Sequence, residues 1–243
     1  MKPVLILQHQ TAEHPAYLET WLQQHSIDYE IRNADCELFP ASIEPYSALA
    51  VLGGGMSVND PLLSNRQAEI LILQSVLRGI PVVGHCLGGQ LMTRALGGTV
   101  GTADRPEIGW QPIEYLDHPD ARAWFGDSPT PLVAQWHYET FSIPAGATLL
   151  ASSPACRNQA WSMGPHLAMQ FHIEIDARKA REWAGDEDPK WALARDSFDT
   201  VQNSTEIIAG IEPNLAQHQA TADNIYQNWL KITDWAAKLS TNL

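Results

Sequence analysis

The stretch Gly84–Gln90 reads GHCLGGQ and lies between an apolar run and a segment of helical composition. A tight turn from strand to helix crowds the residues two before and two after its central position, so both must lack a Cβ. Gly84 and Gly88 meet that need on either side of Cys86. The segment therefore predicts a nucleophile elbow that projects a thiol from the carboxyl edge of a sheet.

Strand-like and helix-like segments alternate on both sides of this turn. Buried strands are expected at 4–8, 48–52 and 80–85, and helices at 15–25, 66–78 and 88–96. Ile70, Leu73 and Leu77 recur at helical spacing in the second helix, and Gly79 follows it as a plausible C-cap. This alternation predicts a parallel sheet with helices on both faces.

Residues 99–171 have a different texture. Short β-like segments separated by Pro, Gly and Asp turns lie at 108–115, 131–135, 148–151 and 166–171. We expect them to extend the same sheet, partly antiparallel, without forming a separate domain. Farther on, 213–239 predicts one amphipathic helix. Its apolar stripe would be Leu215, Ile225, Trp229, Ile232 and Trp235. The expected fold class is α/β, a three-layer sandwich with a mostly parallel central sheet and a helical C-terminal extension.

Composition excludes several classes of function. The chain has 243 residues, with 15 Lys and Arg against 28 Asp and Glu, for a formal net charge of −13. That balance offers no footprint for a nucleic-acid backbone or an anionic membrane. Only four consecutive apolar residues follow the start, short of the roughly 7–15 of a secretory signal. The three cysteines lie far apart and form no CxxC pair. We expect a cytoplasmic protein with reduced thiols.

Cys86 is the candidate nucleophile. Its position at the start of a helix favours a thiolate, and the alternative is an inert buried cysteine. The flanking glycines and the preceding strand favour the nucleophile. Such a thiol needs a base, and the base needs an orienting group. His172 and Glu174 would share one face of an extended segment. A surface pair is the alternative, but a strand end downstream of the elbow favours a catalytic pair.

Gly53–Gly55 follows the strand at 48–52. Glycines let backbone N–H groups approach a ligand closely, as an oxyanion hole requires. The alternative is a flexible turn. The pattern matches neither a dinucleotide fingerprint nor a phosphate-binding loop.

The remaining reactive side chains give weaker signals. His85 is interpreted as packing beside the nucleophile, and His137 fits a structural role as well as a place on a pocket wall. His9 ends the first strand, where a lone histidine proves little. Cys36 and Cys156 are interpreted as passive. An acidic cluster at Glu182, Asp186, Glu187 and Asp188 is interpreted as a solvated face, with a metal site as the alternative. We expect no metal and no cofactor.

Three motifs in this order resemble the class I glutamine amidotransferases. They are GGGMSVND at 53–60, GHCLGGQ at 84–90 and QFHIE at 170–174. LILQH at 5–9 and QWHYETFSIP at 135–144 are similar too. The resemblance covers about residues 4–175 and is greatest to stand-alone members similar to the glutaminase domain of GMP synthetase. It implies the flavodoxin-like class I amidotransferase fold, with that domain at 1–185 and a helical extension at 186–243 packed on it.

The resemblance also implies a catalytic machinery. Its Cys-His-Glu triad falls on Cys86, His172 and Glu174. The oxyanion hole would use the backbone N–H groups of Leu87 and of the turn at Gly54.

Substrate binding is implied at three further residues. Gln90 would help to hold the amino-acid end of the substrate, together with Gly55 and the backbone near Tyr138. Two residues depart from the family pattern, because Ile173 and Gly55 stand where prolines are usual. Neither departure removes a reactive group.

The activity implied is hydrolysis of the glutamine side-chain amide through a γ-glutamyl thioester. Ammonia would pass to an unidentified acceptor, for which a separate synthetase subunit is one possibility. One alternative is a γ-glutamyl peptidase that acts alone, and another is a non-catalytic binding protein with the same fold. The breadth of the pocket beyond the scissile bond would separate amidotransferase from peptidase.

Overall fold

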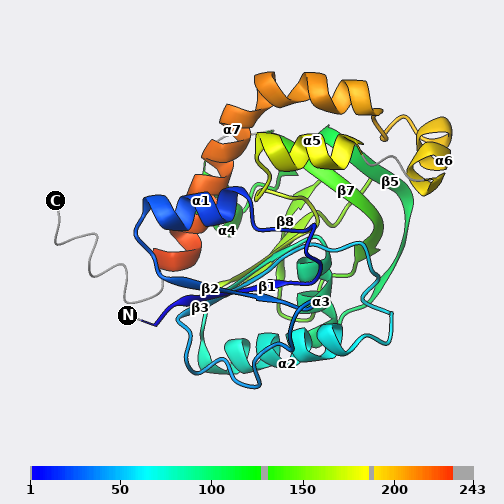
Figure 1. Cartoon of the computed structure of the whole chain (residues 1–243). Coiled ribbons are helices and arrows are strands. Elements are labelled where there is room, and N and C mark those ends of the chain that lie inside the picture. The colour runs from blue at the N-terminus through cyan, green and yellow to red at the C-terminus, as the bar shows by residue number, and fades with distance from the viewer. Residues whose placement is uncertain (1, 127–130, 186–188, 232–243) are drawn as a thin grey trace.

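An eight-stranded sheet forms the centre of the protein, in the order β2-β1-β3-β4-β10-β9-β8-β6. Figure 1 shows the sheet between layers of helices. The computed structural model describes residues 2–126, 131–185 and 189–231. The strands are β1 (Val4–Gln8), β2 (Tyr29–Asn33), β3 (Ala48–Val51), β4 (Val82–His85), β6 (Glu114–Tyr115), β8 (Thr148–Ser152), β9 (Ala160–Met163) and β10 (His166–Met169). The pairs from β2 to β10 are parallel, whereas β9, β8 and β6 add antiparallel strands.

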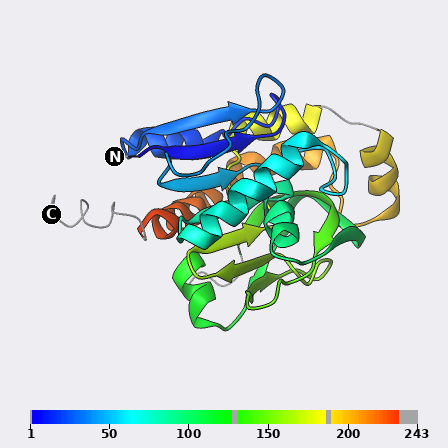
Figure 2. The same cartoon turned by 90° about the horizontal axis from the view of Figure 1, so that it is seen from below.

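Helices cover both faces of this sheet (Figures 1 and 2). On one side lie α1 (Tyr17–Gln24), α4 (Pro119–Phe125), α5 (Ala177–Gly185) and α7 (Ser204–Lys231), and on the other α2 (Leu63–Arg78) and α3 (Leu87–Ala95). Strand β1 shows why a helical layer is needed on each face of the sheet, because its apolar side chains alternate between the two faces. Val4 and Ile6 belong to the core under α1 and α7, and Leu5 and Leu7 to the core over α2 and α3. The predicted three-layer fold is confirmed.

One prediction about the sheet is wrong in part. β5 (Val100–Pro112) and β7 (Leu132–Phe141) do not join the central sheet but pair with each other as a two-stranded antiparallel sheet. Their apolar side chains, such as Ile108 and Trp110, pack against the helices that follow residue 176. That packing holds the two-stranded sheet against these helices, whereas β6, β8, β9 and β10 do extend the main sheet as expected.

The helices also differ in detail from the predicted ones. In α2 the apolar residues at helical spacing face solvent: Ile70, Leu73 and Leu77 are 52%, 39% and 83% exposed. The buried face is instead formed mainly by Ala68, Leu71 and Ile72, which pack into one core cluster with residues of β3, β4 and α3. Gly79 ends the helix in the left-handed conformation, as predicted.

The predicted helix at 213–239 starts earlier than expected, at Ser204, and contains Pro213 within its length. Ile225 and Trp229 of the predicted stripe are buried in the main core. Ile232 and Trp235 lie outside the described residues. The domain boundary at residue 185 stays a prediction.

The parallel strands bring the candidate motifs to one edge. Gly53 follows β3, Cys86 follows β4 and His172 follows β10, and these strands are neighbours. Their carboxyl ends therefore meet at the place where open α/β sheets bind ligands. Within the described ranges, no helix combines the length and apolar character that crossing a membrane requires. The cytoplasmic location stays a prediction.

Candidate active site

Cys86 sits in a strained turn between β4 and α3. Its φ is +48°, a conformation that a residue with a side chain rarely adopts. A Cβ on Gly84 would lie 2.6 Å from the carbonyl carbon of Gly88, and one on Gly88 would lie 2.0 Å from the oxygen of Val51. Only glycine fits at either position. The backbone N–H of Cys86 donates to Met169 at 2.9 Å, which ties the elbow to β10.

The imidazole and the carboxylate of the QFHIE motif are in direct contact. His172 Nδ1 lies 2.6 Å from Glu174 Oε1, and both side chains are buried. The other ring nitrogen of His172, Nε2, is buried without a hydrogen-bond partner among the described residues. A Cβ on Gly53 would lie 2.7 Å from Cε1 of His172 and 3.8 Å from Cβ of Cys86. The glycine turn, the thiol and the imidazole therefore converge on one point.

Charge couples these residues strongly. Burial alone would lower the pKa of His172, but the charges of Glu174 and Cys86 outweigh it and raise this pKa to about 10. Burial likewise acts to raise the pKa of Glu174, yet the cations around it, His172 foremost, hold it well below its usual range. His172 is thus protonated and Glu174 ionised at neutral pH.

Lys179 on α5 is a member of the site that the sequence did not indicate. Its ammonium is fully buried, 3.8 Å from Glu174 Oε1 and 3.2 Å from Glu13 Oε2. It also donates to the backbone oxygen of His14 at 2.8 Å. A lysine in a polar helix carries no sequence signal for burial, because most such lysines face solvent.

Two glutamines surround the thiol. The side-chain amide of Gln170 donates to Cys86 Sγ at 3.6 Å, and the amide of Gln90 donates to Gln170 Oε1 at 3.3 Å. On another side, the thiol lies 3.7 Å from the backbone oxygen of Trp136. The resemblance predicts a substrate-binding role for Gln90, whereas it assigns no role to Gln170, the first residue of the QFHIE motif.

The glycine turn contacts the start of α3. A Cβ on Gly54 would lie 2.8 Å from a side-chain methyl of Leu87, so these two residues are adjacent. As the first residue of α3, Leu87 has an N–H for which its own helix offers no acceptor. The N–H of Gly55 instead donates to Gln10 Oε1 at 2.7 Å. A proline, the usual family residue at this place, has no N–H for that bond. The other departure, Ile173, is fully buried in the main core.

A pocket of about 670 Å³ opens at Cys86 and Gln90. Its walls come from the turn after β3, from β5, from Trp136–Glu139 of β7, and from α6 (Pro189–Ser197). The helix α6 contributes Lys190, whose ammonium lies 3.8 Å from the ring centre of Tyr138. No pattern in the sequence indicated that this C-terminal helix would line the pocket.

Aromatic rings join the pocket to His172. Trp136 contacts both Trp183 of α5 and Trp191 of α6, with ring centres 5.3 and 4.9 Å apart. Trp183 also packs edge to face against His172, at 4.7 Å. These contacts fix α5 and α6 over the site.

The weaker candidates are spread around the site. His85 is buried, with Nε2 3.9 Å from Glu174 Oε2, and burial foremost lowers its pKa to about 4. His137 both lines the pocket and contacts Glu107. His9 packs edge to face against Phe39.

The remaining candidates are the two other cysteines and the acidic cluster. Cys36 is exposed and Cys156 is buried. Glu182 pairs with His14 and Arg178. The rest of the predicted acidic cluster, at 186–188, lies outside the described residues.

Comparison with protein-family models matches residues 18–183 to the class I glutamine amidotransferases, well over half of the 243 residues. The chain belongs to this family. The identification made from the three motifs is confirmed. A solved structure of a glutamine amidotransferase from Methylobacillus flagellatus is similar to this amidotransferase-family chain with a TM-score of 0.89 and 34% identity, over 96% of both chains. Family and fold therefore agree.

Two curated relatives are named for different activities. Gamma-glutamyl peptidase 3 of Arabidopsis thaliana is 36% identical over 102 residues, which cover 39% of this chain and 41% of the peptidase. A glutamine-hydrolysing GMP synthase of Lactobacillus delbrueckii is 36% identical over 126 residues, which cover 51% of this chain and 23% of the synthase. The chain thus spans less than half the length of either relative.

Proposed function

We propose that this protein hydrolyses γ-glutamyl amides, glutamine among them, with Cys86 as the nucleophile. The observation that carries the proposal is the convergence of the elbow cysteine and the His172–Glu174 pair around Gly53. Family membership supports the same chemistry. The reaction requires only groups of the chain itself, and the substrate is a small molecule.

Acylation is the first half of the reaction. Because the pKa of His172 lies near 10, this residue holds a proton at neutral pH. Cys86 reacts as a thiolate, the form in which a cysteine is nucleophilic. The thiolate attacks the γ-carbonyl carbon, and the N–H groups of Leu87 and Gly54 stabilise the oxyanion. Loss of one such donor typically costs about 100- to 1000-fold in rate. His172 then protonates the departing amine, which leaves a γ-glutamyl thioester.

Deacylation uses the same groups in reverse. His172 takes a proton from water, the resulting hydroxide attacks the thioester carbonyl, and glutamate leaves as Cys86 returns to the thiolate. Glu174 accepts a hydrogen bond from Nδ1–H of His172, which keeps the imidazole oriented, and its negative charge balances that of the imidazolium.

Release of glutamate from glutamine and from a panel of γ-glutamyl dipeptides tests the proposal. Cys86→Ala should lower release by at least about 10⁴-fold, because a missing nucleophile removes the covalent route. Cys36→Ala, at an exposed cysteine, is the matched control and should keep the full rate. Equal release by wild type and Cys86→Ala contradicts the proposal. No release together with an unreactive Cys86 thiol favours the non-catalytic binding protein.

A second candidate, the γ-glutamyl peptidase, is favoured by the breadth of the pocket. When glutamine is the substrate, the leaving group is ammonia, which needs little space in the pocket. The cavity nevertheless extends from Cys86 to Leu193 and Phe198. Its volume of about 670 Å³ falls in the range of pockets that enclose drug-sized ligands. Similarity to a named γ-glutamyl peptidase supports this alternative.

If glutamine is the physiological substrate, we propose that a separate synthetase chain receives the ammonia. Similarity to part of a GMP synthase supports that arrangement. The preferred leaving group in the panel separates the two candidates. A ratio of kcat/KM that favours dipeptides with an apolar second residue supports the peptidase, and one that favours glutamine supports the amidotransferase.

A further inference from the structure

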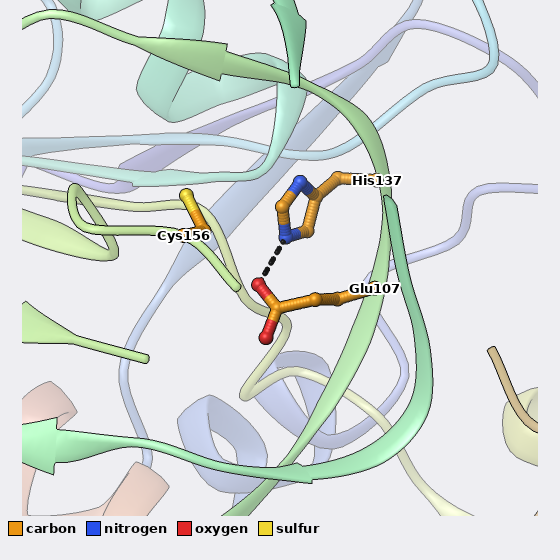
Figure 3. Close-up of side chains that lie close together, drawn as sticks. All are labelled: Glu107, His137 and Cys156. Atoms are coloured by element: carbon orange, nitrogen blue, oxygen red, sulfur yellow. Dashed lines mark hydrogen bonds and ion pairs between the residues drawn. The ribbon is translucent and has the colours of Figure 1, made fainter. Parts of the chain in front are cut away.

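Three side chains with metal-binding atoms lie together beside the pocket but take no part in the chemistry proposed at Cys86. Glu107 comes from β5, His137 from β7 and Cys156 from the turn between β8 and β9 (Figure 3). Their ligand atoms all lie within 4.8 Å of one another, and all three residues are buried. A carboxylate, an imidazole and a thiol therefore share a small buried volume.

The hydrogen bonds of His137 show that Nε2 of its ring and Oε2 of Glu107 need a proton or a cation between them. Its Nδ1 lies 3.0 Å from the backbone oxygen of Glu139, and because a carbonyl can only accept, Nδ1 carries the hydrogen. In the neutral ring Nε2 is then a bare lone pair, yet it lies 3.0 Å from Glu107 Oε2. Two electron-rich atoms face each other, so a proton or a metal ion must lie between them. A fixed Nδ1–H···O=C contact is also what orients metal-bound histidines.

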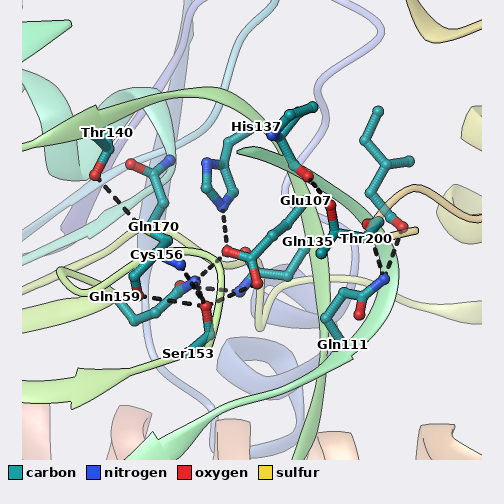
Figure 4. Close-up of polar contacts among 12 residues, drawn as sticks. Glu107, Gln111, Gln135, His137, Thr140, Ser153, Cys156, Gln159, Gln170 and Thr200 are labelled. Carbon is teal, nitrogen blue, oxygen red and sulfur yellow. Dashed lines mark hydrogen bonds and ion pairs between the residues drawn. The ribbon is translucent and has the colours of Figure 1, made fainter. Parts of the chain in front are cut away.

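The other two candidate ligands are oriented by neighbours in the same way (Figure 4). Ser153 donates its hydroxyl to Glu107 Oε1 at 2.8 Å, and the amide of Gln159 donates to Oε2 at 2.6 Å. Thr140 Oγ1 lies 3.2 Å from Cys156 Sγ. Such outer contacts typically accompany metal ligands and tune their affinity.

We propose that Glu107, His137 and Cys156 form a binding site for a divalent transition-metal ion, with Zn²⁺ as the ion that suits this donor set. Bonds of about 2.0–2.3 Å in a tetrahedral site place ligand atoms about 3.3–3.7 Å apart. The separation of 3.0 Å between His137 Nε2 and Glu107 Oε2 is close to this value, and Cys156 Sγ lies within 4.8 Å of the other two ligand atoms.

The charges of the donor set suit a divalent ion. A divalent ion, a neutral imidazole, a carboxylate and a thiolate sum to zero, so the filled site carries no net charge in a buried place, where unbalanced charge is costly. The ion would link β5, β7 and the turn after β8, and so fix His137 on the pocket wall.

Cobalt tests the thiolate ligand directly. The full chain with Cys86→Ala, so that the nucleophile cannot contribute, is stripped of metal and titrated with Co²⁺. We expect a thiolate-to-cobalt charge-transfer band that saturates at one equivalent. Adding Cys156→Ser should abolish the band, and adding Cys36→Ser, the matched control, should leave it unchanged. A band that is absent, or that survives loss of Cys156, overturns the proposal.

Two further measurements do not depend on the folding of the Cys156 variant. X-ray absorption of the Zn²⁺-loaded Cys86→Ala chain should show one sulfur at about 2.3 Å and nitrogen or oxygen at about 2.0–2.2 Å. Only light scatterers would contradict the site. Ser153→Ala, which removes an outer contact of Glu107, should weaken Zn²⁺ binding by about 10- to 100-fold while the cobalt band persists. Unchanged affinity in this variant counts against the proposed arrangement.

Discussion

Glu174 controls the proton on His172 from a fully buried position. Glu174→Gln keeps the shape of the side chain but removes the charge that offsets burial, so the pKa of His172 should fall well below about 10. We expect kcat for glutamate release to fall on the order of 10⁴-fold, as for loss of an orienting carboxylate in other triads. An NMR titration of the imidazole checks the pKa. Glu182→Gln, on the surface of α5, is the control; an unaltered titration of His172 in Glu174→Gln contradicts this account.

Lys179 balances the buried charge of Glu174 and Glu13. Lys179→Met keeps the length of the side chain but leaves Glu13 without its ammonium partner and Glu174 with His172 alone. Breaking a buried ion pair typically costs about 3–5 kcal/mol, and we expect a loss of that order in the free energy of unfolding by urea. Arg178→Met, one residue earlier and largely exposed, should change it by less than about 0.5 kcal/mol. Equal losses in both variants would show that Lys179 adds no specific stability.

At the scale of elements, α6 lines the pocket that opens at Cys86, and we expect it to contact the leaving group of a γ-glutamyl dipeptide. Leu193 lines the pocket although its side chain is 71% exposed, so it contributes little to the core. Leu193→Asp should raise KM several-fold for γ-glutamyl dipeptides with an apolar second residue and leave KM for glutamine unchanged. Steady-state kinetics on both substrates check this. Leu77→Asp, at an exposed leucine of α2, is the control. A parallel rise for glutamine would place Leu193 at the γ-glutamyl end.

The elements differ in how far the sequence could define them. Strands β1, β3 and β4 are short buried runs bounded by turn residues, so their apolar content identified them. The pairing of β5 with β7 was not predictable, because an alternating strand does not specify its partner. The orientation of α2 was missed for a related reason. Both of its faces carry apolar residues, and only its fit against β3, β4 and α3 decides which face is buried.

Across the whole molecule, buried histidines should set the acid limit of stability. Burial, foremost, lowers the pKa of each of these residues to about 4: His9, His85, His166 and His218. The unfolded chain takes up these protons near pH 6.5, before the folded chain does. Their contribution to stability is therefore complete above pH 6.5 and is lost as pH falls toward 4.

Urea unfolding at a series of pH values checks this expectation. The free energy of unfolding should fall from pH 6.5 to pH 4, at up to about 1.4 kcal/mol per pH unit for each proton taken up. His218→Phe should reduce the slope by about one proton, because His218 packs edge to face on Trp110 and a phenyl ring keeps that contact. His25→Phe, at an exposed histidine, should leave the slope as in wild type. A flat profile in wild type contradicts the assignment.

The sequence by itself determined the parts of the site that short-range geometry controls. Sterics of a strand-to-helix turn require glycine on either side of Cys86, and a spacing of two places His172 beside Glu174. These constraints act within a few residues, so a local pattern reveals them. Only the tertiary structure decided that Lys179 contacts Glu174 and that α6 lines the pocket. Those contacts join residues whose burial depends on how whole elements pack, and no local pattern encodes that packing.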